Sequence, residues 1–172
     1  VADQLPSRKA TIEDRRAAEA RIGRRLSQIE EQTSRLGRLG FGPGHYAIGR
    51  GYLALQRYPD ALRHLQLAEE SGYRTPGVAH SLGLVLGRLY EAGLQRANQL
   101  ADEAVRDAFR RDIESRYREP ALAYLRDSGA AQLEAAAYAE GLIAFYERRY
   151  GEALDKARLA ASEAAWLYEA RK

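Results

Sequence analysis

The sequence GPGHYAIGRGYLALQRYPDALRHLQLA, from Gly42 to Ala68, spaces small and aromatic residues as two packed helices would. Small residues let two helices touch, and the large residues beside them fill the remaining space. The first helix is predicted over residues 45–56, and Pro59 and Asp60 suit the first turn of the second helix. The pattern itself consists of Gly49, Tyr52, Tyr58, Ala61, Leu65 and Ala68. It predicts an antiparallel hairpin whose apolar flank must be covered by neighbouring helices.

A second copy of the pattern lies near the C terminus. Its members, at the offsets of Gly49, Tyr58, Ala61, Leu65 and Ala68, are Gly141, Tyr150, Ala153, Ala157 and Ala160. This order of small and aromatic residues, with Ile48 before the first glycine, resembles the tetratricopeptide repeat (TPR). The resemblance implies an all-α fold in which antiparallel helical hairpins stack as a short TPR-like right-handed superhelix of about three repeats.

The middle of the chain is longer than regular repeats allow. Ala61 and Ala153 are 92 residues apart, whereas two repeats of about 34 residues would separate them by about 68. A glycine-containing helix around Gly83 is expected to open the middle repeat. We place the surplus in residues 94–128, as a long helix extending towards residue 113 and an added short helix that starts at Pro120.

The N-terminal part predicts a separate element. Residues 1–40 are expected to form a leader and a long amphipathic helix, followed by a repeat domain over residues 41–172. Glycines at 37, 40, 42 and 44 around Pro43 are expected to end that helix. Its apolar seam consists of Ile22, Leu26, Ile29 and Leu36. The seam either joins two copies as a homodimer coiled coil or packs on its own domain, and two heptads favour the second arrangement.

Composition limits the other possibilities. The 172 residues include 27 basic and 24 acidic ones, interleaved along the chain, so nucleic acid is not an expected partner. No apolar run is long enough to span a bilayer, so direct membrane insertion is not expected. Cysteine is absent, which is compatible with either redox compartment. Because the chain begins at Val1 and contains no methionine, we expect it to be a segment of a longer protein.

No motif for chemistry is present. His45, His64 and His80 do not have the spacing of a zinc site or of a catalytic triad. Adjacent carboxylates such as Glu69 and Glu70 fit a solvated helix face. We therefore predict no enzymatic activity in this segment, no cofactor, no metal and no catalytic residue.

The TPR resemblance also implies a binding surface. In that family the first helix of each hairpin lines a concave groove that binds peptides. The matching residues are Tyr46, Arg50, Leu53, His80, Leu84, Arg88, Tyr138, Leu142, Phe145 and Tyr146. Aromatic anchors beside arginines suit a protein or peptide partner of acidic character. The family's carboxylate clamp for chaperone tails uses lysine and asparagine where this chain has Tyr46 and Arg50, so a chaperone tail is not expected.

A narrower resemblance rests on short stretches from about residue 21 onward. GPGHYAIGRGYLAL, EPALAYLR (119–126), EGLIAFYERRYGEAL (140–154) and the final WLYEARK are similar to the repeat region C-terminal to bacterial serine/threonine protein kinases. This implies a sensor or docking domain, with Trp166 and Tyr168 in a C-terminal capping helix. The kinase motifs themselves are absent from these 172 residues. The alternative is a structural dimerisation module that uses the N-terminal helix.

Overall fold

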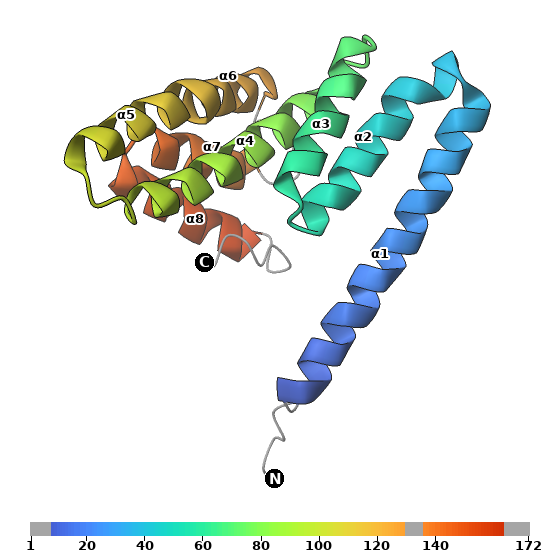
Figure 1. The fold of residues 1–172 in the computed structure, drawn as a ribbon, viewed down its shortest axis with the longest axis horizontal. Helices are drawn as coiled ribbons and strands as arrows, with labels where there is room; N and C mark the ends of the chain where they lie inside the picture. Colours follow the sequence, from blue (N-terminus) through green and yellow to red (C-terminus); the bar gives the residue numbers. More distant parts are fainter. Residues whose placement is uncertain (1–7, 130–135, 164–172) are drawn as a thin grey trace. The chain divides into compact units, whose positions relative to one another are not determined.

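The computed structural model describes residues 8–129 and 136–163, and these residues form helices and turns without a strand (Figure 1). The prediction of an all-α fold is confirmed. The chain divides into two compact units, Val1–Tyr73 and Arg74–Lys172. The boundary that the sequence analysis placed at residue 40 lies inside the first of these units. The predicted C-terminal cap, with Trp166 and Tyr168, lies outside the described residues.

The first unit contains α1 (Arg8–Leu36), α2 (Arg38–Ala54) and α3 (Tyr58–Glu70). The long N-terminal helix belongs to this unit because its apolar seam packs on glycines of α2. A Cβ atom added to Gly51 would lie 3.1 Å from Cγ of Leu26, and one added to Gly44 would lie 2.7 Å from Cγ2 of Thr33. Moving forward along α1 means moving backward along α2, so the two helices are antiparallel. The side chain of Leu36 is outside the described set.

The glycines around Pro43 do not break the chain as predicted. Only Gly37, with a φ angle of 56°, interrupts the helix, and α2 then runs through Pro43 to Ala54. The other glycines serve close packing instead. A Cβ atom on Gly42 would lie 2.5 Å from Cβ of Tyr73. Helix propensity is weak enough for such tertiary contacts to override it.

The hairpin predicted from residues 42–68 is confirmed. Pro59 lies in the first turn of α3, Asp60 follows it, and Gln56 makes the turn with a φ angle of 58°. A Cβ atom on Gly49 would lie 2.7 Å from Cγ of Leu65, so the missing side chain is what lets α2 and α3 approach. Leu65 is fully buried at this contact.

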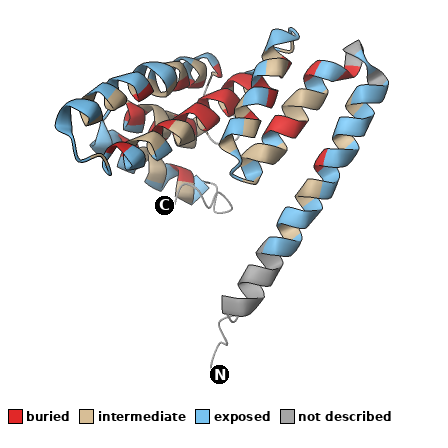
Figure 2. Cartoon of the chain, in the orientation of Figure 1, coloured by how far each residue is buried: buried red, intermediate tan, exposed pale blue. Residues whose placement is uncertain are grey.

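The second unit contains α4 (Pro76–Ala97), α5 (Glu103–Ile113), the π-helix η1 (Glu114–Arg118), α6 (Glu119–Asp127), α7 (Ala136–Tyr146) and α8 (Tyr150–Glu163). Within this unit α4 carries the most buried residues (Figure 2). A Cβ atom on Gly83 of α4 would lie 2.7 Å from Cγ and 3.1 Å from the backbone nitrogen of Leu125. The contact repeats that of Gly49 with Leu65, so α6 is the packing partner of α4.

The residues between α4 and α6 form an insertion that differs from the predicted long helix. The helix stops at Ala97, and α5 begins only after Asp102, whose carboxylate accepts a hydrogen bond of 3.0 Å from the Val105 N–H. From there the chain stays helical without a break. The predicted short helix is α6, which has Pro120 in its first turn and ends at Asp127, but no loop separates it from the helical residues before it. A π-helical turn precedes the proline, and the Glu119 N–H bonds back to the Glu114 carbonyl. In a π-helical turn the backbone hydrogen bonds span five residues instead of four, and this local change accommodates the missing N–H donor of the proline.

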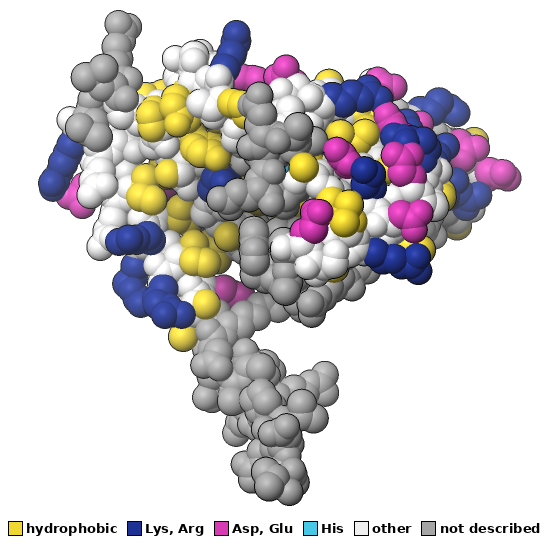
Figure 3. Space-filling model, turned by 180° about the vertical axis from the view of Figure 1, so that it is seen from behind, with side chains coloured by type: hydrophobic (Ala, Val, Ile, Leu, Met, Phe, Trp, Pro, Cys, Tyr) yellow, Lys and Arg dark blue, Asp and Glu magenta, His cyan; other side chains and the backbone are white. Residues whose placement is uncertain are grey.

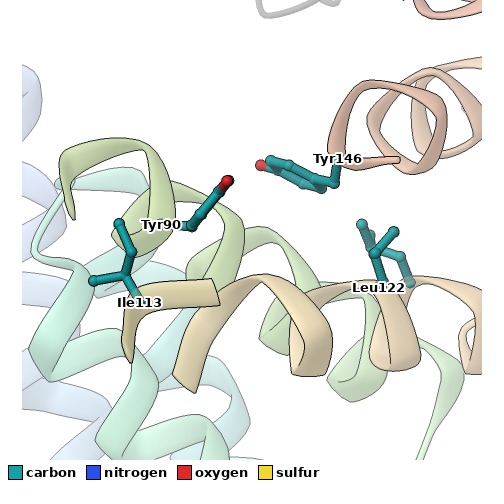
Figure 4. Close-up of a cluster of buried hydrophobic side chains, with 5 residues drawn as sticks. Tyr90, Ile113, Leu122 and Tyr146 are labelled. Atoms are coloured by element: carbon teal, nitrogen blue, oxygen red, sulfur yellow. The ribbon is translucent and has the colours of Figure 1, made fainter. Parts of the chain in front are cut away.

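A buried cluster joins the insertion to the remaining helices of this unit. It consists of Tyr90, Ile113, Leu122, Leu125 and Tyr146. In Figure 4 the rings of Tyr90 and Tyr146 point towards each other, and their centroids are 6.3 Å apart in an edge-on arrangement. Ile113 also packs against Gly93 of α4, where an added Cβ atom would be 3.1 Å away. Since Tyr117 of η1 also packs against the cluster, α4, α5, η1, α6 and α7 all contribute to or touch one core.

Candidate binding surfaces

The first candidate surface lies on α4 and α7 of the second unit. His80, Leu84 and Arg88 follow one another at intervals of four residues on α4, and all three are half-buried. On α7, Tyr138 and Leu142 are half-buried as well. The two helices meet beside Arg88, because the ring of Tyr146 on α7 lies over Gly87 of α4. The residues that the sequence analysis predicted on α4 and on α7 therefore lie on two helices that pack against each other.

Tyr146 occupies a different place from the one predicted, because it is a core residue with 2% of its surface exposed. Its ring lies over Gly87, where an added Cβ atom would be 2.7 Å from Cε2. Its hydroxyl donates a hydrogen bond of 3.0 Å to Oε1 of Glu91. The other carboxylate oxygen of Glu91 accepts from Arg88 at 3.1 Å. We leave Tyr146 out of the ligand-contacting surface and regard it as the residue that holds α7 on α4.

Burial and this network shift two pKa values. Burial raises the pKa of Tyr146 far above its ordinary value of 10.0, and the neighbouring Glu91 carboxylate raises it further. For Arg88, burial alone would lower the pKa, but the Glu91 carboxylate outweighs it and the net change is upward. Tyr146 therefore stays a neutral hydrogen-bond donor, and Arg88 stays a cation, over the whole physiological range.

The C-terminal end of α7 is tied to η1 and α6 through arginines. Arg118 donates a hydrogen bond of 2.7 Å from Nε to the carbonyl of Tyr146. Arg126 pairs with Glu147, and Arg148 pairs with Glu114. Phe145 beside them is 43% exposed. A cation at the C-terminal carbonyls of a helix also complements the helix dipole, so this corner is electrostatically stabilised.

The predicted residues of the first unit lie along α2. Arg50 donates from Nη1 to the hydroxyl of Tyr46 at 3.1 Å, and its guanidinium lies 5.9 Å from the centre of that ring. The rings of Tyr46 and Tyr73 are 5.9 Å apart. Leu53 is half-buried on the same helix. Arg50 is exposed, and its described partner is a neutral hydroxyl.

A histidine pair that the sequence analysis did not anticipate lies in a cleft of about 540 Å³ between the helices of the first unit. The Nδ1 atoms of His45 on α2 and His64 on α3 are 2.8 Å apart, so one nitrogen donates its hydrogen to the other. Burial lowers the pKa of His45, and the positive charge of Arg63 adds to the effect. Burial also lowers the pKa of His64, and the nearby His45 lowers it further.

The predicted dimer seam lines a second cleft, of about 490 Å³, in the first unit. Leu26 is buried at 5% exposure against α2, whereas Ile22 and Ile29 are half-buried. Of the described seam residues, Leu26 packs on its own chain, against Gly51 of α2. Arg21, Arg24 and Arg25 flank it.

Residues that the sequence analysis missed are Gly87 and Glu91, and the His45–His64 pair. The spacing of Arg88 and Glu91, three residues apart on one helix, was an available signal for an ion pair. The contact of Gly87 with Tyr146 joins residues 59 positions apart in the sequence and left no local signal.

Neither a metal-binding cluster nor a membrane-spanning helix is found among the described residues. Within them, no group of three or more His, Cys, Asp or Glu side chains is arranged to hold a metal ion. None of the helices in the described ranges is both long and apolar enough to cross a membrane. On the face in Figure 3, basic and acidic side chains lie next to one another over the helices at the right of the view. Comparisons of the chain with protein-family models, with curated proteins and with solved structures find no match.

Proposed function

We propose that this chain is a non-catalytic protein-binding module built from helical hairpins of the TPR type. The observation that supports it most directly is the repeated contact between a glycine on one helix and a residue of the helix packed against it. Gly49 meets Leu65, and Gly83 meets Leu125 with the same atoms at nearly the same distances. In the last hairpin an added Cβ atom on Gly141 would be 3.6 Å from the backbone nitrogen of Ala157, at the equivalent offset.

In this proposal the first helix of each hairpin contributes residues to a peptide-binding groove of its own unit. The contributing residues are Tyr46, Arg50 and Leu53 in the first unit and His80, Leu84, Arg88, Tyr138, Leu142 and Phe145 in the second. Aromatic and aliphatic side chains would anchor the peptide, and arginines would select acidic groups. Arg50 supports the acidic preference, because it is exposed and its described hydrogen bond goes to a neutral hydroxyl.

The setting we propose for this module is the sensor or docking region of a bacterial serine/threonine protein kinase. This part rests on the sequence resemblance of residues 42–55, 119–126, 140–154 and 166–172 alone. In such a protein the groove would bring a partner or substrate to the kinase domain.

The test is selection of peptides from a random displayed library on immobilised Val1–Lys172, followed by affinity measurements on the enriched peptides. Peptides with Asp or Glu beside aliphatic residues should be enriched. Arg50→Glu reverses a charge in the groove. It should weaken the affinity for these peptides by about tenfold or more, because a complementary interface charge is lost. Arg158→Glu, an equal charge change on α8, should leave affinity unchanged. Equal affinities for both variants would show that the groove assignment is wrong.

A further inference from the structure

The cleft between α1 and α2 in the first unit has an apolar floor that the chain itself leaves open. Ile22, Leu26 and Ile29 of α1 line it together with Ala47 and Gly51 of α2. Except for Leu26, these residues are only half-buried. The glycine and alanine of α2 leave no large side chain to fill the volume of about 490 Å³. Apolar surface of this kind gains free energy when a partner covers it.

The rim of the same cleft is basic. Arg21, Arg24 and Arg25 all line it and all are exposed. Among the contacts of the described residues, none pairs these three arginines with a carboxylate. Arg126 and Arg148 of the second unit differ, since each of them has a glutamate partner. Like charges three and four positions apart on a helix repel each other, so the rim lacks the counter-charge that a partner can supply.

We propose that this cleft is a docking site for an acidic amphipathic helix of another protein. From Ile22 to Ile29 the cleft extends about 10 Å along α1, which corresponds to about two turns of a bound helix. Apolar side chains of the partner, four positions apart, would lie on the floor, and carboxylates beside them would meet the arginines. The lining residues are separate from those of the proposed groove, so this is a second site.

The charge and the floor together favour this occupant over others. A nucleic acid backbone would satisfy the arginines but would place charged phosphates over Ile22 and Ile29. A bound acidic helix satisfies both parts of the cleft. A second copy of the chain would bring its own arginine-rich α1 towards this rim, which opposes like charges.

The test uses a fluorescein-labelled peptide with leucines four residues apart on one helical face and glutamates beside them, titrated with Val1–Lys172 in fluorescence anisotropy. Arg24→Glu combined with Arg25→Glu should weaken binding by at least about tenfold, and higher salt should weaken it too. The matched control, Arg111→Glu with Arg158→Glu, makes the same charge change at exposed positions of the second unit and should bind as the wild type does. Helical circular dichroism confirms that each variant is folded.

A second variant tests the floor. Ile22→Ser removes apolar surface without changing charge, and it should weaken binding of the designed peptide. A scrambled peptide of the same composition should bind poorly to the wild type. The proposal fails if the wild type does not bind the designed peptide, or if the scrambled peptide binds equally well. It also fails if single-stranded oligothymidylate displaces the peptide stoichiometrically, or if light scattering shows a dimer that Ile22→Ser converts to a monomer.

Discussion

The hydroxyl of Tyr146 lies 3.0 Å from a carboxylate oxygen of Glu91, and this hydrogen bond joins α7 to α4 inside the second unit. Tyr146→Phe should remove it and leave the ring in place over Gly87. Hydrogen bonds to charged groups contribute about 1.5–3 kcal/mol, and partial exposure of Glu91 places the expected loss at the lower end, about 1.5 kcal/mol. Urea denaturation measures it. Tyr150→Phe, at an exposed tyrosine on α8, is the control and should change stability by less than about 0.5 kcal/mol.

The glycine contacts predict matched effects in two hairpins. Gly49→Ala and Gly83→Ala should each destabilise the protein, because the new Cβ atom would overlap Leu65 or Leu125. Overpacking costs about 1–3 kcal/mol, and the better helix propensity of alanine offsets part of it. Gly23→Ala, in α1 with no atom within 4 Å of the added Cβ, should instead stabilise by about 0.5–1 kcal/mol. Stabilisation by Gly83→Ala would contradict the packing of α4 on α6.

The His45–His64 pair predicts a loss of stability in acid. Both pKa values are lowered from 6.5, mainly by burial, although Glu30 on α1 opposes the shift for both rings and Asp60 on α3 opposes it for His64. Below pH 6.5 the unfolded chain therefore binds more protons than the folded one. The contribution of the neutral pair to the free energy of unfolding is complete above pH 6.5. It is lost as the pH falls through the lowered pKa values of the folded state. Thermal unfolding between pH 7.5 and pH 5 should show a falling Tm.

His45→Gln separates this pair from other acid-sensitive groups. The variant keeps a polar side chain near His64 but removes one titrating ring, so its Tm should fall less between pH 7.5 and pH 5 than that of the wild type. Arg63, which also faces both rings, remains unchanged in this comparison. Parallel slopes for the two proteins would show that the pair does not sense pH.

Tyr146 predicts the opposite behaviour at alkaline pH. Its folded pKa is raised above the ordinary value of 10.0, so its contribution to stability is complete below pH 10 and is lost as the pH rises beyond it. In the folded protein it should not ionise near pH 10. Tyrosinate absorbance near pH 10 should therefore rise equally in the wild type and in Tyr146→Phe. A lower signal in Tyr146→Phe would contradict its burial.

The hairpin of α2 and α3 was predictable because its decisive contact is local. Gly49 and Leu65 are 16 residues apart, with a turn and a proline between them that mark the helix boundaries. Gly83 and Leu125 make the same contact across α5 and η1, and no local pattern indicates such a pairing. The prediction that the glycines near Pro43 end the helix was wrong for a related reason. Their contacts with Thr33 and Tyr73 come from other elements, and those contacts determine the conformation more strongly than propensity does.

The candidate surface was predictable to a similar extent. Helical spacing alone placed Leu84 and Arg88 on one face of α4, and both lie half-buried there. Tyr146 was assigned to the same surface by its spacing on α7, but the space above Gly87 draws its ring into the core. Spacing shows which residues share a face of a helix. It does not show what covers that face.

The insertion between α4 and α6 has a consequence for how the chain folds. Closing the contact of Gly83 with Leu125 joins residues 42 positions apart, compared with 16 for Gly49 and Leu65. The longer closure adds only about 0.9 kcal/mol of chain entropy, so the equilibrium cost is small. Folding rates, however, fall as contacts become less local. The N-terminal hairpin can therefore form early in synthesis. The part of α4 around Gly83, in contrast, stays uncovered until α6 has been synthesised.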